Sequence, residues 1–186
     1  MSFDDERVRF YFPHREQIEQ WAALRSEAAA AVDEWMTQLG PDIEELARAL
    51  GPDVQFRGLV DSEQAFPSYR LTLAAWGFGN VDDPPACVSL EWLRGRTTMR
   101  GGATPYVGLR ARKVNPVGES LRMSEPVRQS RLVRMDLTSQ WWVAYAYVAP
   151  PVDFPLNADG YRDALLDGLS AVWQAFAPHV EAAIRA

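Results

Sequence analysis

Residues 140–148, QWWVAYAYV, combine two tryptophans, two tyrosines and two valines with only alanine between them. The stretch is too apolar for a strand with one face in water, and too short to span a membrane, which takes about 20 residues. Its residue types and length predict a β-strand. Both faces of this strand must therefore be covered, and the nature of the second cover is the main question that the sequence raises.

A second strand is predicted just before it, at residues 131–137. A two-residue turn between them would set Met135 opposite Trp142 and Val133 opposite Ala144. One face of this hairpin is then suited to contact helices, and it holds Val133, Met135, Leu137, Trp142, Ala144, Ala146 and Val148. The other face holds Leu132, Arg134, Asp136, Trp141, Val143, Tyr145 and Tyr147. Because side chains alternate along a strand, a one-residue slip would exchange the two faces.

Further strands are predicted upstream of this hairpin, at residues 54–60, 68–76, 86–94 and 104–113. The pieces between them are rich in turn-forming residues, including NPVGESLRMSEP at 115–126. Six strands without an intervening helix indicate an antiparallel sheet, because parallel neighbours need long crossover connections.

Helical patterns flank the strands. Residues 7–12 alternate and predict a short strand that Pro13 ends, and residues 14–39 then follow a helical period of apolar positions. A second helix is predicted from Pro41 to Leu50. The last helix should start near Ala158 and pack on the sheet through Leu165, Leu169, Val172, Trp173 and Phe176. Pro178 should kink or interrupt it.

The predicted order is strand, helix, helix, six strands and a long helix, within a single domain of residues 1–186. This is an α+β fold, with a curved antiparallel sheet of six to seven strands on which the helix pair and the long helix pack. In its element order the chain resembles the helix-grip arrangement of the START and Bet v 1-like proteins. Members of that group carry lipids and hormones or cyclise polyketides.

The composition of the chain argues against several classes of function. A net charge of −6 argues against strong attraction to nucleic acid or to an anionic membrane. The only cysteine, Cys87, cannot form an internal disulfide, and the N-terminus lacks the apolar core of a signal peptide, so we expect a cytoplasmic protein without a membrane partner. His14 and His179 lie in different elements, and no metal-binding spacing occurs, so we expect neither a catalytic metal nor a cofactor.

The face of the sheet away from the helices collects polar and aromatic side chains. The candidate binding residues there are Glu91, Tyr106, Arg110, Arg134, Trp141 and Tyr145. Tyrosine, tryptophan and arginine are the common anchors of binding surfaces, and solvated faces seldom concentrate aromatics. We therefore expect a binding domain for a small amphipathic ligand or a protein partner, which could be a second copy in a homodimer.

Two alternatives stay open at this point. The first is a cofactor-independent enzyme, cyclase-like or hydrolase-like, that uses Glu91 or Asp136 as its general base in the same pocket. The second is an ordinary solvated sheet surface, since arginine and carboxylate pairs across strands stabilise sheets without any function.

Overall fold

The computed structural model describes residues 5–61, 63–77, 84–95, 104–151, 153–154 and 156–186. Two helices come first, α1 (Glu6–Thr37) and α2 (Gly40–Leu50). They are followed by β1 (Val54–Leu59), β2 (Ser68–Leu73), the one-turn helix α3 (Ala74–Gly77), β3 (Cys87–Glu91) and β4 (Tyr106–Arg110). The chain continues with α4 (Pro116–Met123), α5 (Glu125–Gln129), β5 (Arg134–Met135), β6 (Trp142–Tyr147) and α6 (Ala158–Arg185).

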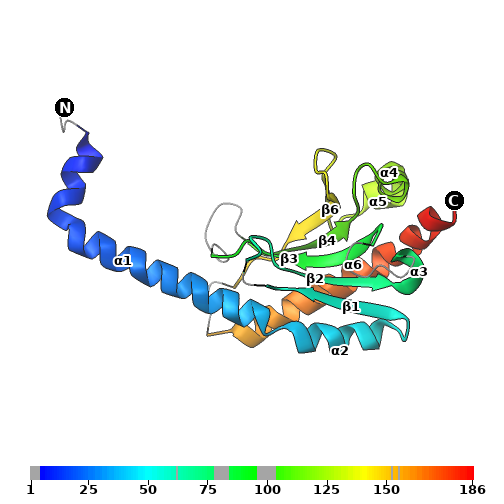
Figure 1. The fold of residues 1–186 in the computed structure, drawn as a ribbon, viewed down its shortest axis with the longest axis horizontal. Coiled ribbons are helices and arrows are strands. Elements are labelled where there is room, and N and C mark those ends of the chain that lie inside the picture. Colours follow the sequence, from blue (N-terminus) through cyan, green and yellow to red (C-terminus); the bar gives the residue numbers. More distant parts are fainter. Residues whose placement is uncertain (1–4, 62, 78–83, 96–103, 152, 155) are drawn as a thin grey trace.

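Among the described residues, six strands form one antiparallel sheet in the order β1-β2-β3-β4-β6-β5. This confirms the α+β class and the strands predicted from residue 54 onward, except that residues 74–76 of the predicted strand 68–76 belong to α3. The sheet is not a simple meander, because the chain leaves β4 through α4 and α5 before it forms the last hairpin. Strand β6 therefore returns between β4 and β5, and Figure 1 shows it beside β4.

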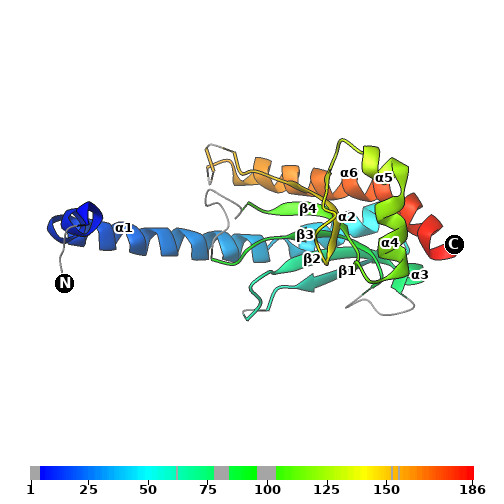
Figure 2. The same ribbon diagram turned by 90° about the horizontal axis from the view of Figure 1, so that it is seen from above.

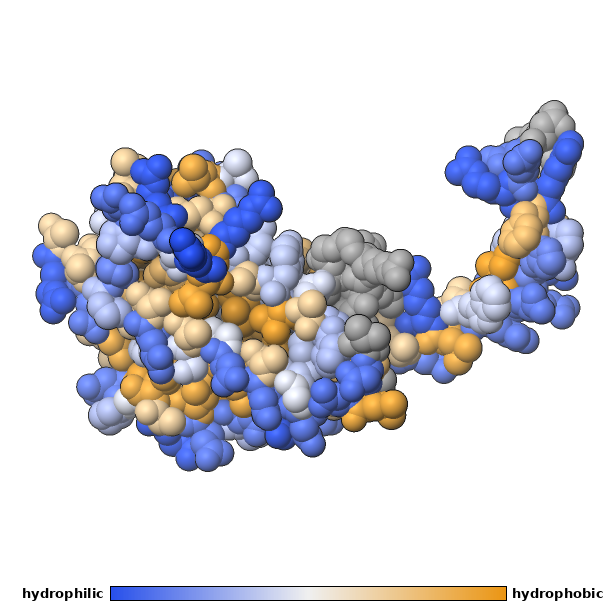
Figure 3. Space-filling model, turned by 180° about the vertical axis from the view of Figure 1, so that it is seen from behind, coloured by the Kyte–Doolittle hydropathy of each residue, from blue (hydrophilic) through white to orange (hydrophobic). Residues whose placement is uncertain are grey.

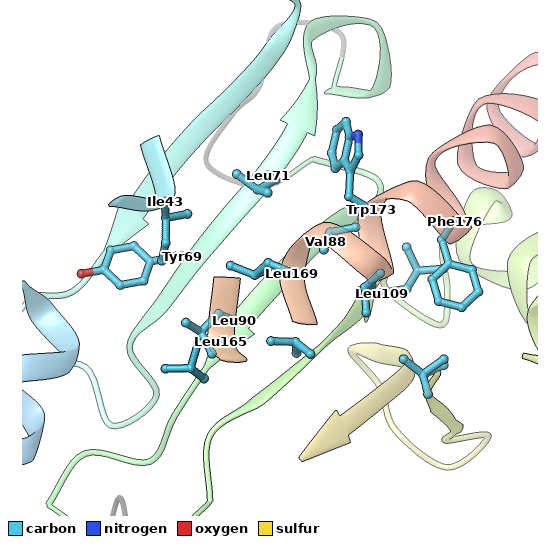
Figure 4. Packing of buried hydrophobic residues seen from close by; sticks show 14 of the residues in the cluster. Ile43, Tyr69, Leu71, Val88, Leu90, Leu109, Leu165, Leu169, Trp173 and Phe176 are labelled. Atoms are coloured by element: carbon cyan, nitrogen blue, oxygen red, sulfur yellow. The ribbon is translucent and has the colours of Figure 1, made fainter. Parts of the chain in front are cut away.

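Helices α2 and α6 cover one face of the sheet. Leucine side chains of α6 lie against apolar side chains of the central strands, and this contact is free of solvent (Figure 4). The α6 residues predicted to pack there are all buried: Leu165, Leu169, Val172, Trp173 and Phe176. The predicted packing of α6 is thus confirmed, and the helix continues through Pro178 to Arg185 without interruption.

The predicted strand at residues 7–12 is wrong, because α1 already begins at Glu6 and includes Pro13. The Asp5 side chain caps the helix by accepting a hydrogen bond from the backbone N–H of Arg7 at 2.9 Å. A strand needs a neighbouring strand for its backbone hydrogen bonds, whereas a helix satisfies them locally. This part of α1 lies far from the sheet (Figures 1 and 2), so the helix forms and the resemblance to the helix-grip order loses its first strand.

The region predicted to be a turn-rich connection after β4 contains α4 and the start of α5. The side chain of Asn115 caps α4 by accepting from the N–H of Val117 at 2.9 Å, and Pro116 follows it in the first turn. These start signals were present in the sequence, but the short helix has too few apolar positions to show a clear period. Helices α4 and α5 lie at the end of the sheet opposite to the free end of α1 (Figure 2).

Candidate functional site

The connection between β5 and β6 is longer than the two-residue turn predicted for it. Met135 pairs with Ala144 rather than with Trp142, so the predicted register is wrong by two residues. The Asp136 side chain accepts hydrogen bonds from two backbone N–H groups of the turn, at 3.0 and 2.9 Å, and these contacts stabilise the longer loop. Because the error is an even number of residues, the two faces of β5 stay as predicted.

A β-bulge determines on which face of the sheet the side chains of Trp142 and Val143 lie. The ladder between β4 and β6 shifts beside Arg110, which pairs with Trp142 and leaves Val143 as an extra residue of β6. Val143 is consequently buried in the core on the helix side, while Trp142 lies on the side of Arg110. The prediction had these two residues on the opposite faces and is wrong for both.

The opposite side of the sheet from α2 and α6 is called the polar face here. Cross-strand pairing brings its residues into rows across the sheet, which include Arg70, Ser89, Gly108, Tyr145 and Arg134 in one row and Ser68, Glu91, Tyr106 and Tyr147 in the next. A third row holds Cys87, Arg110 and Trp142. The strand residues predicted for the binding face therefore do lie on one face, away from the helices.

A hollow of about 360 Å³, called the central pocket, opens on this face. Its lining residues are Phe66, Arg70, Glu91, Tyr106, Arg110, Trp141 and Trp142. It brings together four of the six predicted site residues. The other two, Arg134 and Tyr145, line a neighbouring hollow of about 310 Å³ near the β5 edge of the sheet. The rings of Tyr145 and Tyr106 lie 5.5 Å apart and join the two hollows.

The central pocket contains one carboxyl group between two arginines. Glu91 is only 9% exposed, and its Oε1 accepts a hydrogen bond from the hydroxyl of Tyr106. Burial raises the pKa of Glu91, and the hydrogen bond from Tyr106 and the charges of Arg110 and Arg70 offset part of this rise. Burial and the Glu91 carboxylate raise the pKa of Tyr106, so its hydroxyl remains a hydrogen-bond donor at neutral pH.

Trp141 forms the exposed rim of the central pocket. The guanidinium carbon of Arg110 lies 4.8 Å from the centre of its ring, and that of Arg112 lies 4.9 Å away. Such cation–π contacts contribute about 0.5–1 kcal/mol each at exposed sites. The Nε of Arg110 is buried and has no hydrogen-bond partner among the described residues. The pocket therefore holds a desolvated donor beside a flat aromatic surface that is still 43% exposed.

Arg122 holds the segment that carries both tryptophans. Its guanidinium group is buried and donates to the carbonyl oxygens of Gly118, Ala111, Ser139 and Trp142 at 2.9–3.3 Å. These four carbonyls belong to α4, to the end of β4, to the turn and to β6. Arg122 thus positions the rim of the pocket without lining it.

Three pocket residues were missed at the sequence level. Arg70 had a signal, because Ser68, Arg70 and Thr72 alternate with Tyr69 and Leu71 in the predicted strand. Trp142 could be assigned to the pocket only once the bulge was known. Phe66 lies in a loop, where no periodic pattern reports the direction of a side chain.

No known protein family, curated protein or solved structure matches this chain. Within the described ranges, no three His, Cys, Asp or Glu side chains lie close enough together to hold a metal ion. No helix in the described part of the chain has the length and apolar character needed to cross a membrane.

Proposed function

We propose that the central pocket binds a small amphipathic molecule in which an anionic group, such as a carboxylate, adjoins a flat apolar part. The observation that carries this function is the convergence of Arg70, Arg110, Glu91 and Trp141 in one hollow. Its volume of about 360 Å³ lies within the range of roughly 300–1,000 Å³ that is usual for small-molecule sites.

The charges favour an anion over a cation. The lining of the pocket contains two guanidinium groups and one carboxyl group, so positive charge exceeds negative charge. Arginine also forms strong, often bidentate hydrogen bonds with carboxylates. A ligand oxygen near Arg110 would also accept from its buried Nε, which otherwise costs about 1–3 kcal/mol as an unpaired donor. The ring of Trp141, which is still partly exposed, then offers a flat surface to the apolar part of the ligand.

A small molecule fits this site better than a protein partner does. Stable protein interfaces bury roughly 800 Å² of surface on each partner. Four of the six predicted site residues instead line one small hollow, which suits a small molecule. Cys87 is buried and free, and we place this function in a reducing cytoplasm.

The test is calorimetric titration of 2-naphthoate and of its neutral isostere 2-naphthamide into the protein. We expect the carboxylate to bind more tightly than the amide. The double variant Trp141→Ala with Arg110→Ala should stay folded and bind 2-naphthoate about ten- to a hundredfold more weakly, as expected for the loss of a charge-assisted hydrogen bond and a stacking surface. Arg134→Ala, in the neighbouring hollow, serves as the control and should change the affinity less than about threefold. Equal affinities for the carboxylate and the amide would contradict an anion site.

A second candidate is a cofactor-independent, hydrolase-like or cyclase-like enzyme with Glu91 as general base. Its burial and raised pKa favour this role, since a base is most effective when its pKa approaches the working pH. Asp136 is unsuited to it, because hydrogen bonds from the side chain and backbone of the turn lower its pKa. Hydrolysis of 2-naphthyl acetate tests this candidate, which requires turnover in the wild type that falls to the uncatalysed rate in Glu91→Gln. Equal rates in both proteins exclude Glu91 as the base.

A further inference from the structure

Glu91 is the only acidic residue in the lining of the central pocket, and its carboxyl group is poorly compensated for its burial. Its Oε1 accepts a hydrogen bond from the Tyr106 hydroxyl, but Oε2 has no hydrogen-bond partner in the described part of the chain. Glu91 also forms no ion pair with any described residue. Buried charges in proteins are normally paired, so these surroundings favour the protonated form of the Glu91 carboxyl.

The titratable and charged groups that face Glu91 come from its own strand and from the two neighbouring strands. Arg70 lies on β2, Tyr106 and Arg110 lie on β4, and Cys87 lies on β3 with Glu91. Both arginines stay charged, while burial raises the pKa of the Cys87 thiol and of the Tyr106 hydroxyl and keeps both groups neutral. The other lining residues are aromatic and uncharged. Glu91 is therefore the lining residue whose charge changes at and below neutral pH.

An anion in the central pocket would lie close to Glu91. A sphere of about 360 Å³ is only roughly 9 Å across, so a ligand carboxylate bound by Arg110 or Arg70 lies within that distance of the Glu91 side chain. A second negative charge in one small site favours the protonated form of a carboxyl group. A charged carboxylate only accepts hydrogen bonds, whereas a protonated carboxyl also donates one.

We propose that Glu91 takes up a proton from solvent when the anionic ligand binds, and that Oε2 then donates a hydrogen bond to the anionic group. This role rests on the anion site proposed above and makes Glu91 a determinant of its specificity. The neutral carboxyl leaves the charges of Arg70 and Arg110 to the ligand alone. Because the complex holds one more proton, the affinity should fall as the pH rises, by at most tenfold per pH unit.

The test is calorimetric titration in buffers of different ionisation enthalpy, at pH values from about 5 to 9, which measures the protons taken up on binding. The probes are 2-naphthoate and 2-naphthalenesulfonate, which remains an anion throughout this range. We expect both anions to take up at least about half a proton at the pH of largest uptake. Uptake with the sulfonate places the proton on the protein, and the neutral 2-naphthamide should bind without uptake.

Two variants assign the proton to Glu91. Glu91→Gln keeps the shape of the side chain but cannot change its charge, so proton uptake and the pH dependence of anion affinity should both disappear. Tyr106→Phe keeps the carboxyl and removes only the hydrogen bond to it. Because that hydrogen bond lowers the pKa of Glu91, uptake should persist in Tyr106→Phe and move to higher pH.

The outcomes separate this role of Glu91 from the proposed function. Binding of both anions to the wild type without proton uptake would overturn the role and leave the anion site in place. Uptake that persists in Glu91→Gln would also overturn it, because another group would then hold the proton. Failure of both anions to bind would overturn the proposed function, and the role of Glu91 with it.

Discussion

Glu91 shows how a single residue links the sheet to the chemistry of the pocket. Its place in β3 opposite Tyr106 is set by the strand register, and its side chain is buried on the polar face. Burial disfavours the charged carboxylate, so the folded chain holds the Glu91 proton to higher pH than the unfolded chain does.

This shift predicts a dependence of stability on pH. The contribution of Glu91 to stability is complete below its unfolded pKa, near 4.5, and is lost as the pH rises through the higher folded pKa. In Glu91→Gln the side chain stays neutral and can still accept from Tyr106. We expect the free energy of unfolding of the variant to gain on that of the wild type as the pH is raised from about 4 to 8. Urea unfolding at a series of pH values measures this difference, and a constant difference would contradict the raised pKa.

Elements of this protein were predicted well where a pattern extends over many residues. The stripe of α6 extends along most of the helix, and the five residues predicted from it to pack on the sheet are all buried. Period-two patterns located the six strands that the described residues form. The alternation at residues 7–12 was too short to distinguish a strand from the start of α1. Helix α4 is shorter still, and its capping residue and proline were taken for turn signals.

Helix α6 also offers a direct test of core packing. Phe176 is fully buried among core residues, so Phe176→Ala removes a large side chain and leaves a cavity. We expect a loss of about 3–5 kcal/mol in the free energy of unfolding. Phe66→Ala changes a side chain that is mostly exposed and should cost less than about 0.5 kcal/mol. Chemical denaturation of both variants provides the comparison, and a loss below about 1 kcal/mol for Phe176→Ala would disagree with its burial.

The whole molecule consists of a compact body and the projecting part of α1, residues 6–28, which is called the arm (Figures 1, 2 and 3). Because no described residue before Ala29 is buried, deletion of residues 1–28 removes none of the described core residues. The shortened chain should fold and keep its near-ultraviolet circular dichroism. Its melting temperature should stay within about 4 °C of that of the full chain at the same protein concentration, since a change of 1 kcal/mol shifts it by about 2–4 °C at this size. Failure of the shortened chain to fold would show that the arm contributes to the core.

The sequence by itself determined the α+β class, the positions of the six strands, the packing stripe of α6 and the polar–aromatic character of the second sheet face. These features depend on side-chain period, which the local backbone geometry imposes on neighbouring residues. Only the tertiary structure decided that α1 begins at Glu6, that β6 lies between β4 and β5, and that a bulge at Val143 turns Trp142 toward Arg110. It also separated Arg134 and Tyr145 from the four predicted residues that line the central pocket. Strand order and bulges depend on hydrogen bonds between segments far apart in the chain, and no local pattern encodes which of those segments will meet.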